Sequence, residues 1–159
     1  MKIVLTRVDE RMIHGQVMTV WARLLSVDEA IVISDYAAHD ELQRTTMELS
    51  VPAGVDLTIA TVDEAYEILS HAKLRGSRAM VIFKELHDVV SMVGKGYKPE
   101  SLNIGGMYRK PGKTEYAKAL CLDQHDIDDL KMLVDSGIDV FYQVSPMTGK
   151  ESIKKYLQS

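Results

Sequence analysis

Ala79-Met80-Val81-Ile82-Phe83 is a run without a single polar residue, and it follows a helix-like segment that Gly76 ends. A strand that is apolar at every position is typical of a sheet covered on both faces, whereas a half-exposed strand alternates. Similar β-rich runs lie before it, at 2–8, 30–34 and 55–60. Amphipathic segments separate these runs, so the sequence predicts an α/β fold with a mostly parallel central sheet and helices on both faces.

The spacing of apolar residues and caps predicts the other elements. Helices are expected over 16–25, 40–50, 61–74, 85–93, 123–134 and 150–157, and short strands over 102–104, 119–122 and 138–144. The strands after Leu102 lack full-length helices between all of them, which allows an antiparallel or mixed edge in the C-terminal half. No linker, repeat or low-complexity segment divides the chain, so residues 1–159 are expected to form one domain.

Composition excludes several classes of protein. The formal charge of −4 disfavours a surface that follows nucleic-acid phosphates. No apolar run reaches the ~20 residues that span a bilayer, and the first residues do not resemble a secretory signal peptide. Cys121 is the only cysteine, which excludes an internal disulfide framework. We therefore expect a cytoplasmic protein.

The most informative chemistry follows the first strand, in Arg7-Val8-Asp9-Glu10-Arg11-Met12-Ile13-His14-Gly15-Gln16-Val17. One histidine lies beyond two arginines and next to a glycine, at the point where a strand passes into a helix. An anion there meets the unpaired N–H groups and the dipole of the helix. Ligands of open parallel sheets also bind at this edge. The segment therefore predicts a site that holds a phosphoryl group beside an imidazole.

Each residue of this segment has an expected role. A neutral imidazole offers a free ring nitrogen, so His14 is the candidate nucleophile. Arg11 is expected to offset charge on a transferring phosphoryl group, and Asp9 to orient His14 or Arg11 through a charge-assisted hydrogen bond. Backbone donors at Gly15 and Gln16 are expected to hold the phosphoryl oxygens.

Four further residues have supporting roles in this interpretation. Arg7 is expected at an exposed electrostatic rim that favours fast association, and Met12 and Ile13 are expected to offer apolar contact to a partner protein. Asp35 follows the second strand at the same predicted edge. It is expected either to face His14 in support of phosphate binding or to cap the next helix.

The segment from Arg7 to Val17, followed by Trp21, resembles the opening of the IIB components (EIIB) of the mannose/fructose/sorbose family of the bacterial phosphotransferase system (PTS). The resemblance extends along the chain through 31–35, 40–41, 52–55, 102–107 and 143–146. Ser34-Asp35 stands where the family commonly has two acidic residues, and His39 stands where an asparagine is usual. Neither departure touches the His14 segment, although their effect on partner choice stays open.

The resemblance implies a phosphocarrier with the activity of a protein-Nπ-phosphohistidine:sugar phosphotransferase. His14 would accept a phosphoryl group at Nδ1 from a phosphohistidine on the IIA component, supported by Arg11. It would pass the group to a sugar bound by the membrane components IIC and IID. The protein would be transiently peripheral to the inner face of the membrane. No metal, nucleotide or other cofactor is expected, because the phosphoramidate donor is already activated.

Alternatives from other classes are a non-catalytic anion-binding or regulatory α/β module and a small hydrolase with His14 as general base. Gly112-Lys113-Thr114 ends like a phosphate-binding loop, but its first glycine would fall at Met107, so no nucleotide site is expected. The remaining histidines are scattered, and no metal site is expected from their spacing. The sugar (mannose, fructose, sorbose or an N-acetylated amino sugar) and the presence of a homo-oligomer stay open.

Overall fold

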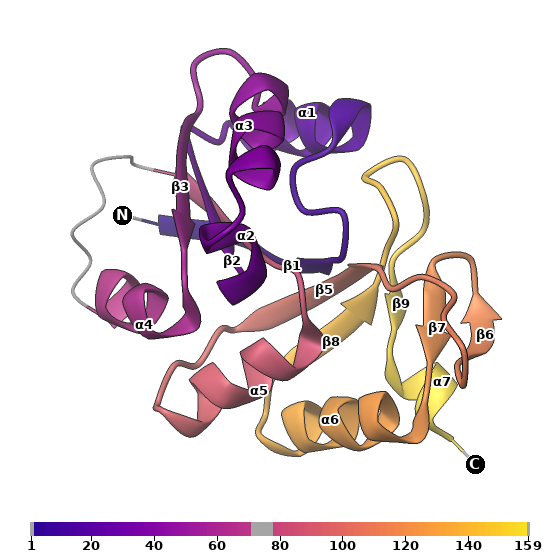
Figure 1. Cartoon of the computed structure of the whole chain (residues 1–159). Helices are drawn as coiled ribbons and strands as arrows, with labels where there is room; N and C mark the ends of the chain where they lie inside the picture. Colours follow the sequence, from indigo (N-terminus) through magenta and orange to yellow (C-terminus); the bar gives the residue numbers. More distant parts are fainter. Residues whose placement is uncertain (1, 71–77, 159) are drawn as a thin grey trace.

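A computed structural model describes residues 2–70 and 78–158 (Figure 1). The strands are β1 (Lys2–Asp9), β2 (Glu29–Ile33), β3 (Asp56–Ala60), β4 (Arg78–Phe83), β5 (Ser101–Gly106), β6 (Thr114–Ala117), β7 (Leu120–Leu122), β8 (Asp139–Tyr142) and β9 (Glu151–Ser152). The helices are α1 (Gly15–Leu24), α2 (Asp35–Ala38), α3 (Glu41–Ser50), α4 (Val62–Ser70), α5 (Leu86–Gly94), α6 (Gln124–Asp135) and α7 (Lys154–Leu157). No described helix is long and apolar enough to cross a membrane.

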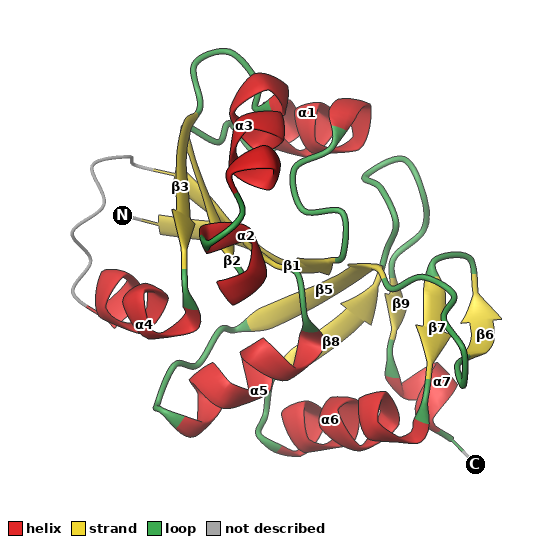
Figure 2. Ribbon diagram, in the orientation of Figure 1, coloured by secondary structure: helices red, strands yellow, loops and turns green. Residues whose placement is uncertain are grey.

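Seven strands form one sheet in the order β3-β2-β4-β1-β5-β8-β9. The pairs from β3 through β8 are parallel, and β9 runs antiparallel to β8 at the edge. This confirms both the mostly parallel sheet and the antiparallel edge that the short C-terminal strands indicate. A separate hairpin pairs β6 with β7 (Figure 2).

Two hydrophobic layers cover the sheet, one on each face. On β4, Ala79, Val81 and Phe83 belong to the layer that includes residues of α4, α5 and α6, while Met80 and Ile82 belong to the layer with α1 and α3. Figure 1 shows these two groups of helices on opposite sides of the strands. An unbroken apolar strand is therefore required, because successive side chains point into different layers.

The connections between strands change sides of the sheet at the carboxyl end of β1. Strands β1 and β4 pair with each other, yet α1 after β1 and α5 after β4 pack on opposite faces. Neighbouring strands with such divergent connections form the topological switch point at which open α/β sheets bind ligands. The loop that carries His14 lies at this point.

Several element boundaries differ from the expectations. The single-turn helix α2 and strand β6 were not expected, and the segment expected as helix over 150–157 begins as strand β9. Strand β8 is shorter than the 138–144 run. The expected continuation of α4 to Leu74 lies outside the described residues.

Candidate functional site

Strand β1 delivers two charged side chains, Arg7 and Asp9, into the interior at its carboxyl end. Both side chains are fully buried and form an ion pair, with 3.1 Å between Arg7 Nη2 and Asp9 Oδ2. The Arg7 guanidinium also donates to Asn103 Oδ1 (2.6 Å), to the carbonyl oxygen of Gln143 (3.0 Å) and to that of Val144 (2.8 Å). These bonds tie β1 to β5 and to the loop after β8, so Arg7 is a rigid support.

Glycines on β5 make room for this buried pair. A Cβ atom added to Gly105 would lie 2.0 Å from Arg7 Cζ, and one added to Gly106 would lie 2.5 Å from Asp9 Oδ1. Side chains do not approach one another this closely. The two glycines are therefore needed for the close approach of the β5 backbone to Arg7 and Asp9.

Asp9 is the centre of the hydrogen-bond network. Its Oδ2 atom contacts His14 Nε2 at 2.9 Å, and its Oδ1 atom accepts from the backbone N–H of Arg11 at 3.0 Å. Burial acts to raise the pKa of Asp9, but the hydrogen bond with His14 and the charge of Arg7 outweigh it, and the pKa lies below its ordinary value. Asp9 is therefore ionised at neutral pH and acts only as an acceptor.

The Asp9 contact decides which nitrogen of His14 is free. Because an ionised carboxylate can only accept, Nε2 must carry the proton, and the neutral ring then has its lone pair on Nδ1. The His14 side chain is 19% exposed, so the ring is held from one side and reachable from the other. An imidazole oriented in this way by a carboxylate can act chemically either as a base or as a nucleophile through its free nitrogen.

The first turn of α1 offers free backbone donors next to the ring. His14 is the N-cap residue with extended backbone, and its side chain makes no capping bond. Gly15 has φ +48°, a left-handed conformation that glycine adopts without penalty, and both Gly15 and Gln16 are exposed. The N–H groups of a helix start have no partner inside the helix and favour an anion.

Arg11 is the exposed cation of the site. Its side chain is 45% exposed, lies 3.7 Å from Asp9 through Nε, and is stacked over the Tyr108 ring at 5.0 Å. The preceding residue, Glu10, pairs with Lys110 and accepts from the backbone N–H of Tyr108. The segment after β5 therefore packs against the His14 loop and restricts Arg11 without burying it.

Three expectations about surface exposure are wrong. Arg7 is not at a rim, because its side chain is fully buried. Met12 and Ile13 are only 2% and 3% exposed and pack in the α1 and α3 layer, so neither offers an apolar surface to a partner. A turn in which Met12 N–H donates to the Asp9 carbonyl, with Met12 at φ +59°, accompanies this inward placement.

Asp35 lies at the start of α2 and does not hydrogen-bond to His14. Its Oδ1 atom accepts from the backbone N–H of Val62 at 2.9 Å, at the first residue of α4. The helix-capping interpretation therefore describes its contact, although the helix is α4 rather than the one that follows Asp35. The described contacts give no support to a phosphate-binding role.

Sequence reasoning missed the residues that hold the site from outside β1. Asn103 is buried within β5 and also donates to the Gln143 carbonyl at 3.0 Å. A polar amide in an otherwise apolar strand was the available signal. Tyr108 and Lys110 were signalled only by a short aromatic and basic run directly after that strand.

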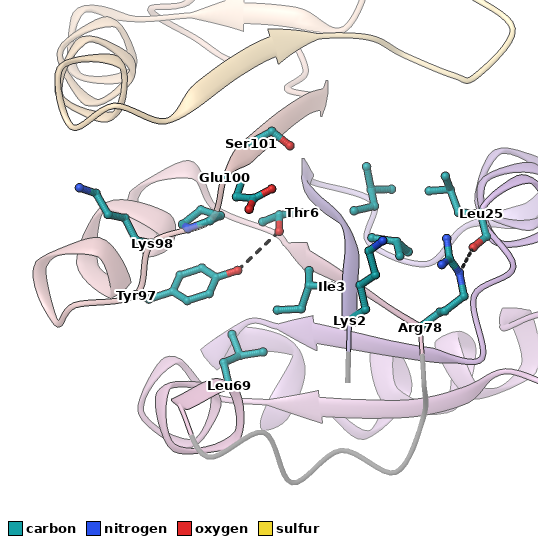
Figure 3. Close-up of a pocket in the computed structure, with 13 residues that line it drawn as sticks. Lys2, Ile3, Thr6, Leu25, Leu69, Arg78, Tyr97, Lys98, Glu100 and Ser101 are labelled. Carbon is teal, nitrogen blue, oxygen red and sulfur yellow. Dashed lines mark hydrogen bonds between the residues drawn. The ribbon is translucent and has the colours of Figure 1, made fainter.

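Four hollows lined by described residues lie away from His14. The largest of four that described residues line, with a volume of about 700 Å³, sits near the amino ends of β1 and β4 and is lined by residues such as Lys2, Arg78 and Tyr97 (Figure 3). His14 lines none of these four.

Comparison with known proteins agrees with this geometry. The family model of the PTS system sorbose subfamily IIB component matches residues 3–159. The sorbose-specific EIIB component of Klebsiella pneumoniae is 33% identical, over 91% of this chain and 88% of its own. The mannose-specific EIIAB component of Escherichia coli K12 is 36% identical over 88% of this chain, which matches 43% of that longer protein.

Solved structures give the same result. The crystal structure of the IIB domain of the Klebsiella pneumoniae sorbose permease superposes with a TM-score of 0.90, covering 98% of this chain and 95% of that one at 31% identity. The N-acetylgalactosamine-specific IIB component 1 of Escherichia coli has a TM-score of 0.89 at 26% identity, covering 96% of this chain and 99% of that one. This chain belongs to the sorbose subfamily of IIB components of the phosphotransferase system, the phosphotransfer subunits of sugar uptake.

Proposed function

We propose that His14 carries the phosphoryl group, on Nδ1. The observation that supports this most directly is the 2.9 Å contact of His14 Nε2 with Asp9, an ionised and fully buried carboxylate. It assigns the proton to Nε2 and leaves Nδ1 as the attacking atom. The proposal extends the family assignment to a particular residue and a particular nitrogen.

In the first transfer, the Nδ1 lone pair attacks the phosphorus atom of a phosphohistidine on a IIA component. A new N–P bond forms as the donor's N–P bond breaks, and the electron pair of the broken bond returns to the donor ring, which leaves as neutral imidazole because its second nitrogen keeps a proton. Nε2–H stays on His14 and continues to donate to Asp9. In the transition state, negative charge is spread over three phosphoryl oxygens. Catalysis of this step therefore depends on positioning and on electrostatics.

Arg11 and the start of α1 stabilise that charge. Arg11 is the exposed guanidinium of the loop, while both terminal nitrogens of the buried Arg7 guanidinium already donate to Asp9, Asn103 and the loop after β8. The free N–H groups at Gly15 and Gln16 offer the same charge complementarity from the backbone. Arg11 is therefore assigned to transfer, and Arg7 to the support of Asp9.

In the second transfer, a sugar hydroxyl attacks phosphorus, the N–P bond breaks, and the electron pair returns to Nδ1. The hydroxyl proton passes to a base on the acceptor side or to solvent. The sugar would be bound by the membrane components IIC and IID, with this chain cytoplasmic and docked transiently at the inner face of the membrane. The mannose-specific relative is named as a fused EIIAB component, which fits a IIA partner for this IIB chain.

The decisive experiment mixes the protein with a phosphorylated IIA donor and follows intact mass. An acid-labile, base-stable phosphoryl adduct is expected on the wild type and on His39→Ala, a variant of another exposed histidine. His14→Gln should form none. Nuclear magnetic resonance of the adduct should place phosphorus on Nδ1.

Other results would select another function. Saturable phosphate binding without an adduct, in the presence of a competent donor, would indicate the non-catalytic anion-binding module. Continuous release of phosphate from the donor, catalysed only when His14 is present, would indicate the hydrolase. An adduct on Nε2 would contradict the proposed role of Asp9.

A further inference from the structure

The fold brings together three potential metal ligands that are distant in sequence. His87 lies in the first turn of α5, and His125 and Asp129 lie one helical turn apart on α6. Helices α5 and α6 pack side by side (Figure 1). Histidines that are scattered in the sequence therefore lie close together in the fold.

The distances suit a small divalent ion. His87 Nδ1 lies 3.1 Å and His125 Nδ1 lies 3.5 Å from the same atom, Asp129 Oδ2. Ligands at about 2.0–2.1 Å from zinc in a tetrahedron are about 3.4 Å apart. All three ligand atoms lie within 4.8 Å of one another, so rotation of one exposed imidazole closes the set.

The burial and charge around these three side chains favour the binding of a cation. Asp129 is nearly buried, with its side chain 9% exposed, while both rings are largely exposed. A nearly buried carboxylate therefore lies beside two exposed imidazoles. The ring centroids are 5.2 Å apart, and Asp88 adds negative charge beside His87.

The ligand types narrow the choice of ion. Two imidazoles and one carboxylate are typical of zinc and of neighbouring transition metals, whereas calcium and magnesium prefer oxygen ligands throughout. Ligands spaced by four residues on one helix face recur in zinc sites because they project in the same direction.

We propose that His87, His125 and Asp129 bind one Zn²⁺ ion, with a fourth position open to solvent. The ion links α5 to α6 across one layer of the fold. This site is separate from the His14 loop, and no step of phosphoryl transfer depends on it. Its presence or absence is therefore independent of the proposed phosphocarrier role.

The test is titration of the chelator-treated full chain with Zn²⁺ by calorimetry, and with Co²⁺ by visible absorption. One saturable equivalent and a tetrahedral Co²⁺ spectrum are expected. His87→Ala, His125→Ala and Asp129→Asn should each weaken binding at least about tenfold, since even outer-shell changes cost 10–100-fold. Circular dichroism checks that each variant is folded.

Two further variants control for other histidines. His39→Ala changes an exposed histidine next to α2, and His14→Gln removes the ring beside Asp9; both should retain full binding. Zn²⁺ binding of undiminished affinity in His87→Ala, or loss of binding in His14→Gln, would overturn the proposal. So would the lack of saturable binding by the wild type.

Discussion

Replacement of Asp9 by Asn tests both the packing and the chemistry of the site. The substitution keeps the shape of the side chain but removes its charge. Three bonds converge on the carboxylate, from Arg7, from His14 and from the backbone N–H of Arg11. All three partners donate, so an amide cannot satisfy them: whichever way it is turned, its NH₂ group faces a donor.

The expected loss of stability follows from what remains around Arg7. Breaking a buried ion pair typically costs 3–5 kcal/mol because a charge is left uncompensated. In the variant, Arg7 retains three neutral acceptors, at Asn103, Gln143 and Val144. The loss of stability should therefore lie near the lower end of that range. We expect Asp9→Asn to lower the free energy of unfolding by about 3 kcal/mol, or the Tm by roughly 6–12 °C for a chain of this size.

Urea unfolding at neutral pH measures this change. Asp63→Asn is the matched control, because Asp63 pairs with Lys95 on the surface and is 90% exposed, so little change is expected there. A loss of less than about 1 kcal/mol for Asp9→Asn would refute the reasoning that Arg7 depends on a buried carboxylate. Phosphoryl transfer to the folded variant should slow by about 100-fold or more, because His14 loses its orientation.

Acid titration gives an independent check. The pKa of Asp9 is lowered in the folded protein, so its stabilising contribution is complete above the unfolded value of about 3.9 and is lost as pH falls through the folded value. The difference in unfolding free energy between wild type and Asp9→Asn should therefore narrow only below about pH 4. A difference that stays constant to lower pH would contradict an ionised Asp9.

Three other substitutions have defined outcomes. Gly105→Ala should cost at least about 3 kcal/mol in urea unfolding, because its Cβ meets the immobilised Arg7 guanidinium, whereas Gly94→Ala, with open space around it, should change stability by less than about 1 kcal/mol. Arg11→Gln should unfold like the wild type yet slow phosphoryl transfer by about 10²–10³-fold in a rapid-quench assay, and equal rates would exclude Arg11 from transfer. Burial, followed by the charges of Asp35 and Glu85, raises the pKa of Asp88 to about 6, so stability should fall as pH rises from about 4 to about 6. Asp88→Asn should remove that slope and stabilise the protein at neutral pH by up to about 1 kcal/mol after solvent screening, and an unchanged slope would contradict the assignment.

Periodicity predicted the sheet well because burial on two faces leaves an unmistakable pattern. The apolar run of β4 and the capping residue Asp123 indicated their elements directly. The pattern failed where a polar residue is buried for a tertiary reason. The sequence alone suggests that Arg7 is a surface cation, whereas its buried contacts with Asp9 and Asn103 show why it lies inside.

Local sequence also could not show which way the His14 loop turns. Met12 and Ile13 follow charged residues and suggest an exposed contact, yet the turn at Asp9 directs both into the core. His87 and Asp129 are 42 residues apart in the sequence, and no short motif predicts their contact. Interactions of this kind depend on topology, which single-sequence patterns do not carry.

The uncapped start of α1 has a consequence for how a loaded chain differs from an empty one. The His14 side chain makes no capping bond, so the phosphoryl group that we propose on His14 would supply the missing cap of that helix. Phosphorylation of His14 should therefore also reduce fraying of the first turn of α1, and hydrogen exchange of the backbone amides of Gln16 and Val17 should slow. The phosphorylated and unphosphorylated chains would then differ in local order as well as in charge. A membrane partner could distinguish them on docking, before phosphoryl transfer begins.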